Sequence, residues 1–240
     1  MNEMGQPIGW PVGTDLPRPR PEKVRLEGRF CSLVPLDTEA HGKELWEAFS
    51  ADTTGKNWTY LPIAPIETEA DLGVFLRAAE ASEDPLYFTV LNAKGRAVGH
   101  ATYLRIDPAN GVIEVGYIHF SPLMQRTPMS TEAMYLMMAY VFETLGYRRY
   151  EWKCDALNAP SLAAAKRLGF TFEGVFRQAV VYKGRNRDTA WFAAIDAEWP
   201  GLREAFEAWL SPANFDAEGK QRERLGDLTS LVRVSSDPLT

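Results

Sequence analysis

Three strand-like segments in succession, residues 85–122, constrain the fold more than any other part of the sequence. Their residues follow a strand-like rather than a helical period, and Lys94-Gly95 and Asn110-Gly111 mark the turns between them. Turns this short join antiparallel neighbours. The sequence therefore predicts a three-stranded meander inside a larger sheet.

Helical and strand-like segments alternate on both sides of this meander. Two amphipathic helices are expected at residues 37–49 and 67–81, and a long apolar helix is expected from Thr127. A strand (148–156), a short helix (158–170), a strand pair around Lys183-Gly184 and a final helix (200–210) follow. This order predicts an α+β fold with a mixed, mostly antiparallel central sheet flanked by helices. We expect one domain over residues 23–210, a Pro/Gly-rich arm over residues 1–22 and a polar extension over residues 211–240.

Composition excludes several function classes. The net charge is −6 and no block of Lys or Arg stands out, so we expect no nucleic-acid partner. Cys31 and Cys154 lie far apart outside any Cys-x-x-Cys motif, which is typical of reduced thiols in a cytoplasmic protein, and we expect no metal site. The longest apolar run, residues 133–142, is about half of what a membrane-spanning helix needs, so we expect no membrane association.

The start of the long apolar helix, in "PLMQRTPMSTEAMYLMMAYVFETLG" (122–146), is small and polar. Thr127 suits the N-cap and Pro128 suits the first helical position. A helix N-terminus exposes unpaired N–H groups and a partial positive charge, which favours an anion. Two interpretations stay open at this point: a plain helix cap, or a cradle for phosphate.

These segments together resemble the GNAT (Gcn5-related N-acetyltransferase) superfamily, in particular its ribosomal-protein N-terminal acetyltransferase branch. The resemblance covers about residues 25–199 and rests on "EVGY" in the third meander strand, "TEA" at the start of the long helix, and Asn-x-x-Ser-x7-Gly-Phe from Asn158 to Phe170. The resemblance implies acetyl-CoA as co-substrate and a primary amine as acceptor.

Carried over to this sequence, the family's acetyl-CoA loop falls on residues 125–130. Three positions depart from the family pattern: Pro128 replaces the first glycine, Ser130 the second small residue, and Ala165 the tyrosine that serves many members as general acid. The resemblance gives Ile118 and Phe120 backbone contacts to the pantetheine arm and gives Asn158 a contact to its amide. The expected cofactor-binding residues are Ile118, Phe120, Gln125, Arg126, Thr127, Met129, Ser130, Thr131, Asn158 and Ser161.

Glu114 is the first candidate for the base that takes the amine proton. Alternation along its strand places it on one face with Gly116 and Ile118, among apolar neighbours that would raise its pKa. His119, expected on the opposite face, is the second candidate and His100 the third. Ser161 is the remaining hydroxyl that could assist the leaving sulfur, although it also suits a helix first turn.

The acceptor is expected between the two early helices. Trp58 and Tyr60 in "NWTYLP" would form an aromatic wall for an amine, and core packing is an equal alternative. The amine could be a protein N-terminus or a small molecule, and the oligomeric state, monomer or dimer, stays open. Two alternatives are a coenzyme A sensor without turnover, motivated by Pro128 and Ala165, and an interaction protein that uses the Pro-rich arm.

Overall fold

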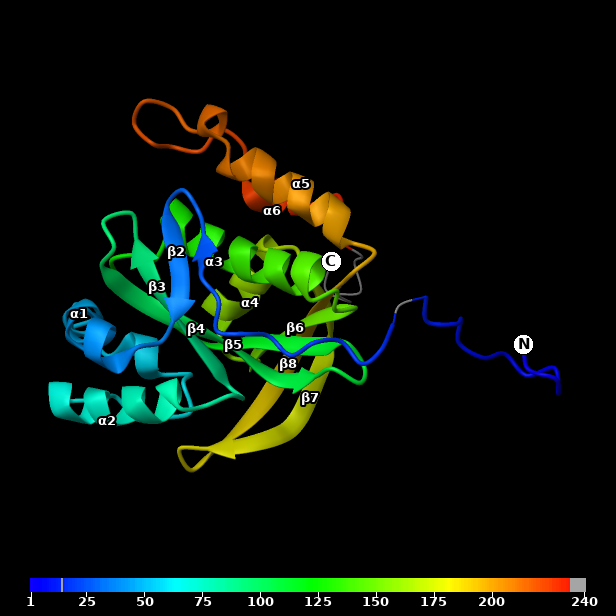
Figure 1. Cartoon of the computed structure of the whole chain (residues 1–240), viewed down its shortest axis with the longest axis horizontal. Coiled ribbons are helices and arrows are strands. Elements are labelled where there is room, and N and C mark those ends of the chain that lie inside the picture. The colour runs from blue at the N-terminus through cyan, green and yellow to red at the C-terminus, as the bar shows by residue number, and fades with distance from the viewer. Residues whose placement is uncertain (14, 234–240) are drawn as a thin grey trace.

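The computed structural model describes residues 1–13 and 15–233, which build one eight-stranded sheet with helices on both faces (Figure 1). The strand order is β1-β2-β3-β4-β5-β6-β8-β7, and neighbouring strands are antiparallel except β5 and β6. The predicted α+β class with a mixed, mostly antiparallel sheet is confirmed. The strands are β1 (Leu26–Glu27), β2 (Cys31–Pro35), β3 (Leu86–Asn92), β4 (Ala97–Asp107), β5 (Val112–Phe120), β6 (Arg149–Asp155), β7 (Thr171–Tyr182) and β8 (Arg185–Ile195).

The helices begin close to where the sequence predicts. Asp37 caps the first and Thr68 the second, each accepting a hydrogen bond from a backbone N–H three residues on. The long apolar helix starts at Pro128 and changes to a π-helical turn at Tyr140. The helices are α1 (Thr38–Ser50), η1 (Lys56–Trp58), α2 (Glu69–Glu80), α3 (Pro128–Ala139), η2 (Tyr140–Thr144), α4 (Ala159–Arg167), α5 (Trp199–Leu210), η3 (Pro212–Asn214) and α6 (Leu225–Ser230).

Each face of the sheet has its own core. On one face α1 and α2 pack through residues such as Leu45 and Leu76 against Tyr87 and Leu91 of β3. On the other face α3, α4 and α5 form the larger core with β3 to β6 and β8 (Figure 1). A side chain on β5 or β6 therefore points toward one of two different environments.

One extra residue in β5 sets which side chains point to which face. Thr102 of β4 pairs with Gly116, but His100, two residues earlier, pairs with His119, three residues later. The extra residue is a β-bulge, and Tyr117 takes it up with a positive φ of 43°. His119 therefore lies on the same face as Glu114, and Ile118 packs against the core of the opposite face. The expectations that His119 opposes Glu114 and that Ile118 shares its face are both wrong.

The glutamate of the "TEA" motif, Glu132 in α3, has a structural role. Its carboxylate is 4% exposed and accepts hydrogen bonds from the backbone N–H groups of Arg29, Phe30 and Cys31. These three residues form the turn from β1 into β2, so Glu132 fastens the first hairpin to the start of α3. Gly28 lies directly against this carboxylate, where an added Cβ would clash.

The two ends of the chain differ in how they meet the domain. The N-terminal residues run away from the body, with the Trp10 side chain 87% exposed (Figure 1). After Ser211 the chain folds back, and Leu225 of α6 is buried in the larger core while Thr229 donates a hydrogen bond to the Arg167 carbonyl. Within the expected polar extension, α6 therefore packs on the domain while residues 217–224 are exposed, and residues 234–240 lie outside the described part.

Replacing Glu132 with glutamine tests this fastening. The amide keeps the size of the side chain but leaves one oxygen and no charge for three N–H donors, so we expect the free energy of unfolding to fall by about 1–3 kcal/mol in urea denaturation. Glu204→Gln, at an exposed position on α5, is the matched control. Equal stability of the two variants would contradict the assignment.

Candidate active site

The parallel pairing of β5 with β6 stops partway along both strands. Val112 to Val115 pair with Arg149 to Trp152, and beyond these residues the two strands continue without pairing to each other. We call this opening between residues 116–120 and 153–155 the fork. It leaves backbone groups at the centre of the sheet without a neighbouring strand.

The backbone of β5 presents Ile118 and Phe120 to the fork. The N–H of Ser121 donates to Val98 on β4, and because strand backbone groups alternate, those of residues 118 and 120 point the other way. The Phe120 carbonyl already accepts a hydrogen bond from Gln125 Nε2 at 2.7 Å. The groups expected to contact pantetheine therefore lie along one arm of the fork.

The first turn of α3 follows β5 after the short loop of residues 121–127. Thr127 occupies the N-cap with extended φ and ψ, and Pro128 is the first helical residue, as predicted. The Thr127 hydroxyl does not cap the helix, because it donates instead to the Met124 carbonyl at 2.7 Å. The Met129 N–H has no hydrogen bond within the described part of the chain, whereas the Ser130 N–H bonds weakly to the Thr127 carbonyl at 3.3 Å.

Other candidates near this turn are already engaged. Ser130 Oγ donates to the Thr127 carbonyl at 2.9 Å. Thr131 is buried and its Oγ1 accepts a hydrogen bond from the Arg167 guanidinium, so Arg167 braces α3 against α4. Arg126 is exposed with a positive φ of 59°. At the start of α3, backbone N–H groups are therefore more available to bind an anion than the side chains are.

The short helix α4 lies beside the other arm of the fork. Asn158 is its N-cap and accepts a hydrogen bond from the Ser161 N–H at 3.2 Å. Ser161 Oγ accepts a hydrogen bond from the indole Nε1 of Trp152 at 3.0 Å. Ala165 is fully buried in the larger core and supplies no donor. Asn158 and Ser161 are therefore fixed next to the residue at which β6 leaves β5.

Glu114 is buried among charges rather than among apolar groups. Its Oε2 lies 2.7 Å from Arg105 Nη1 and 2.9 Å from Lys153 Nζ, and Lys153 also lies 2.7 Å from Glu151 and above the Trp191 ring. Burial raises the pKa of Glu114, while Lys153 and then Arg105 oppose the rise. The expected direction of the shift is right, but the expected apolar surroundings are wrong.

The second oxygen of Glu114 is differently placed. Oε1 lies on the side of Gly116, where a Cβ built on that glycine would come within 3.5 Å of it. Gly116 is the first residue of β5 beyond the paired part, so this oxygen is next to the fork. One carboxylate oxygen thus anchors the group to two cations and the other faces the opening.

The two histidines form part of an aromatic cluster. His119 is buried, its ring stacks on Phe49 with centroids 3.9 Å apart, and it meets the Trp58 ring edge to face with centroids 4.3 Å apart. Desolvation lowers the pKa of His119 to about 4 and that of His100 to about 3. Both imidazoles are neutral at neutral pH, and neither nitrogen of His119 has a partner among the described residues. A base this weak competes poorly for the proton of an alkylammonium group.

The loop between α1 and α2 connects both arms of the fork. Gln125, which follows β5, donates to the Asn57 side chain, and Tyr60 donates to the carbonyl of Leu157, which follows β6. Lys183 at the tip of the β7–β8 hairpin donates to the Trp58 carbonyl at 2.7 Å. Tyr60 therefore lies beside the fork, whereas Trp58 is 7% exposed and packs against His119, as in the core-packing alternative.

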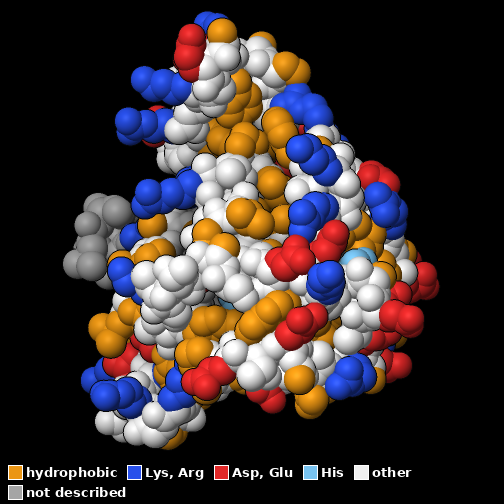
Figure 2. Space-filling model, turned by 90° about the vertical axis from the view of Figure 1, so that its left-hand side faces the viewer, with side chains coloured by type: hydrophobic (Ala, Val, Ile, Leu, Met, Phe, Trp, Pro, Cys, Tyr) orange, Lys and Arg blue, Asp and Glu red, His pale blue; other side chains and the backbone are white. Residues whose placement is uncertain are grey.

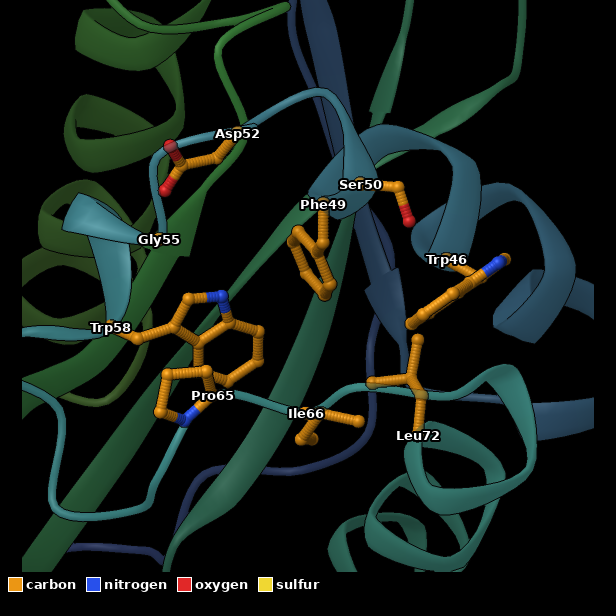
Figure 3. A pocket seen from close by; sticks show the side chains of 9 residues that line it. All are labelled: Trp46, Phe49, Ser50, Asp52, Gly55, Trp58, Pro65, Ile66 and Leu72. Carbon is orange, nitrogen blue, oxygen red and sulfur yellow. The ribbon is translucent and has the colours of Figure 1, made fainter.

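Behind Trp58 lies a small cavity of about 130 Å³ (Figure 3). Its walls are mainly apolar and come from α1, the loop and the start of α2, with Trp46, Phe49 and Ile66 around it. The Asp52 carboxylate at its edge is occupied by the hydrogen-bond donors of Thr54 and Asn57. The cavity thus lies beside the edge contact of Trp58 with Phe49 of α1 and has no free charge in its wall among the described residues.

Several residues of this site escaped sequence analysis. Arg105 comes from β4, and Trp152, Lys153 and Asp155 come from β6; the buried Asp155 carboxylate accepts a hydrogen bond from the Tyr182 hydroxyl of β7 at 2.9 Å. Alternation of Glu151 and Lys153 with apolar residues in "YEWKCD" was an available signal for a charged face of β6. Asp188 accepts hydrogen bonds from the Gln178 N–H and the Asn186 amide within the β7–β8 hairpin.

Two further observations concern the described residues as a whole. No helix among them is both long and apolar enough to span a bilayer, and no three His, Cys, Asp or Glu side chains gather as a metal site. On the face shown in Figure 2, Lys, Arg, Asp and Glu side chains all appear, with apolar side chains between them.

Known proteins match this chain in sequence and in structure. The sequence profile of the Acetyltransferase (GNAT) domain family matches residues 32–171. The chain belongs to the GNAT acetyltransferase family. A GCN5-related N-acetyltransferase from Brucella melitensis has a crystal structure that matches with a TM-score of 0.89 at 49% identity, over 91% of this chain and 100% of that one.

Curated GNAT relatives are more distant. YnaD of Bacillus subtilis, named as an N-acetyltransferase, is 23% identical over 64% of this chain and 89% of its own. YdaF of the same species, whose name places it among ribosomal N-acetyltransferases, is 26% identical over 45% of this chain and 58% of its own. The relatives thus include the ribosomal type that the sequence resembles, and acetyl transfer is the reaction of the family.

The hydrogen bonds that hold the loop between α1 and α2 predict its local dynamics. Lys183→Met removes the donor to the Trp58 carbonyl, and Tyr60→Phe removes the donor to the Leu157 carbonyl. We expect faster amide hydrogen exchange in residues 55–61 and little change in the free energy of global unfolding, because both side chains are partly exposed. Lys94→Met, in the exposed β3–β4 turn, is the control; unchanged exchange in the loop would show that these bonds do not hold it.

Proposed function

We propose that this GNAT protein transfers an acetyl group from acetyl-CoA to a primary amine, which attacks the thioester directly at the fork. The observation that carries the proposal is the early end of the β5–β6 pairing, which leaves the backbone of Ile118 and the N–H of Phe120 open beside the start of α3. An extended pantetheine arm can pair with such an open strand as an added strand would. The unpaired Met129 N–H lies at the helix N-terminus that would receive the pyrophosphate.

Glu114 is the proposed base. The Oε1 atom of Glu114 lies next to the fork, and burial raises the pKa of its carboxyl group. The attacking amine must lose a proton, and Glu114 would accept it directly or through water. The neutral, weakly basic His119 shares the face and is better suited to shaping the acceptor side. Asn158 and Ser161 would contact the pantetheine amide and the sulfur, and Trp58 and Tyr60 would border the acceptor.

The acceptor amine belongs to one of two classes, a protein N-terminus or a small molecule. YdaF, by its name, favours the first. The deciding experiment measures release of the coenzyme A thiol with α-amino peptides, polyamines and aminoacyl analogues. Acetyl-CoA at 100 times its dissociation constant should also stabilise the fold by about 2.7 kcal/mol. A melting temperature that stays the same in millimolar acetyl-CoA, together with no turnover on any amine, would refute the proposal.

Glu114→Gln should lower kcat by roughly 10²-fold with little effect on acetyl-CoA affinity. The loss should shrink at high pH, where the amine is already neutral and needs no base. Glu151→Gln is the matched control, because Glu151 pairs with Glu114 in register and shares Lys153 but has no place in the proton transfer. If His119→Ala shows this pH pattern and Glu114→Gln does not, the base is His119.

Lys153→Met should move the acidic limb of the rate profile to higher pH. Desolvation raises the pKa of Glu114, and the positive charge of Lys153 is the largest effect that lowers it. Removing that charge therefore raises the pKa of Glu114 further. Glu114 then loses its proton, and becomes able to act as a base, only at a higher pH. A pH profile of kcat/KM that stays in place, or moves down, would contradict the role of Glu114.

Ser130→Asp should weaken acetyl-CoA binding about 5- to 150-fold. Two like charges 4 Å apart repel by about 4 kcal/mol at an effective dielectric of 20, and solvent reduces this to roughly 1–3 kcal/mol. The helix itself should not lose stability, because an acidic residue in the first turn suits the helix dipole. The control is Ser130→Asn, because asparagine has the size of aspartate without its charge. Equal binding by both variants would mean that Thr127-Pro128 is a plain helix cap.

A further inference from the structure

Trp152 stands at the point where the fork opens. It is the last residue of β6 that pairs with β5, opposite Val115, and its side chain is 7% exposed on the face covered by α4. The ring packs against Phe170, with centroids 5.7 Å apart, and its Nε1 reaches Ser161 Oγ at 3.0 Å. The indole is therefore held between the strand and the helix that border the opening.

This hydrogen bond determines where the Ser161 hydroxyl can point. A serine hydroxyl has one hydrogen to donate and two lone pairs to accept with. Because one lone pair receives the indole N–H, the Ser161 hydrogen must point to another acceptor. An O–H group whose oxygen accepts a hydrogen bond is also the stronger donor, since hydrogen bonds in a chain polarise one another.

A sulfur already lies within reach of this donor pair. Cys154 follows Trp152 on the same face of β6, is 5% exposed, and has no disulfide partner. Burial raises the pKa of the Cys154 thiol, and hydrogen bonds from Ser161 and Trp152 are among the effects that oppose the rise. The same two side chains therefore favour the charged form of a sulfur beside them.

We propose that Trp152 is a positioning residue that aims the Ser161 hydroxyl at the leaving sulfur of coenzyme A; this rests on the function proposed above. The amine nitrogen forms a bond to the acetyl carbon, the carbon–sulfur bond breaks, and its electron pair goes to sulfur. The proton lost by the nitrogen goes to Glu114 or to water. Ser161 keeps its own proton and stabilises the thiolate by hydrogen bonding, so a weak acid suffices where Ala165 leaves no phenol.

The thiol of bound coenzyme A reports this contact directly. A hydrogen bond to the thiolate favours the charged form, so the thiol pKa in the complex should be lower with the parent protein than with Trp152→Phe or Ser161→Ala. Thiolate absorbance in the ultraviolet during a pH titration measures it. We expect both variants to raise this pKa, to lower kcat about 2- to 10-fold, the factor of one hydrogen bond, and to leave acetyl-CoA affinity nearly unchanged.

Further variants separate positioning from packing. Trp209→Phe removes another buried indole N–H, bonded to Gln221 away from the fork, and should change neither the thiol pKa nor kcat. Ser161→Thr keeps a hydroxyl and should retain the low thiol pKa. The double variant of Trp152 and Ser161 should be no worse than Ser161→Ala, because both changes remove the same contact. Cys154→Ala should leave the thiol pKa of coenzyme A low.

Each result has a defined meaning. An unchanged thiol pKa in Trp152→Phe, or a fall in melting temperature with kcat intact, would make Trp152 a packing residue and overturn the inference. If Trp152→Phe does not fold, an unchanged thiol pKa in Ser161→Ala overturns it equally. Absence of turnover by the parent protein on every amine would instead refute the proposed function.

Discussion

The site depends on one feature of the sheet, the parallel pairing of β5 and β6 that ends at Val115 and Trp152. Parallel neighbours require a crossover, and α3 supplies it by packing its apolar length on the sheet. The crossover begins just beyond β5, so the start of α3 lies next to the open part of the strand. The fork and the helix N-terminus are thus two consequences of one connection.

Several charged side chains together keep Glu114 ionisable at the closed end of the fork. Glu114 is buried, and an isolated carboxylate there would be neutralised by protonation. Lys153 and Arg105 hold one of its oxygens, and Glu151 balances Lys153. Burial nevertheless has the larger influence on the pKa of Glu114. A carboxyl group that is both anchored and raised in pKa is suited to take up a proton and release it again.

The sequence predicted the elements and their order well because these depend on local signals. Turn glycines, helix caps and apolar periods lie within a few residues of one another, and the start of α3 at Thr127-Pro128 followed from them. The faces of β5 could not be predicted in the same way. Gly116, next to the bulge at Tyr117, is a glycine that also suits an unbroken strand, and a single extra residue moves every later side chain to the other face.

The partners of the site residues were also beyond sequence analysis. Arg105, Lys153 and Glu114 lie on three strands, and no spacing along the chain indicates that their charged groups meet. The Thr127 hydroxyl bonds to Met124 instead of capping α3, because the loop before the helix brings that carbonyl closer. Ser161 was found from a motif, but the indole that orients it comes from the strand below.

The two groups proposed to handle charge lie on opposite faces of the sheet. Glu114 points to the face of α1 and α2, where the loop with Tyr60 crosses the fork, whereas Trp152 and Ser161 belong to the face of α3 and α4. An acceptor amine on the first face and a coenzyme A sulfur on the second would meet only through the opening between the strands. The sheet then keeps the base apart from the thiolate, with which it would otherwise compete for the proton released by the amine. Such a separation places each developing charge next to the group proposed to stabilise it.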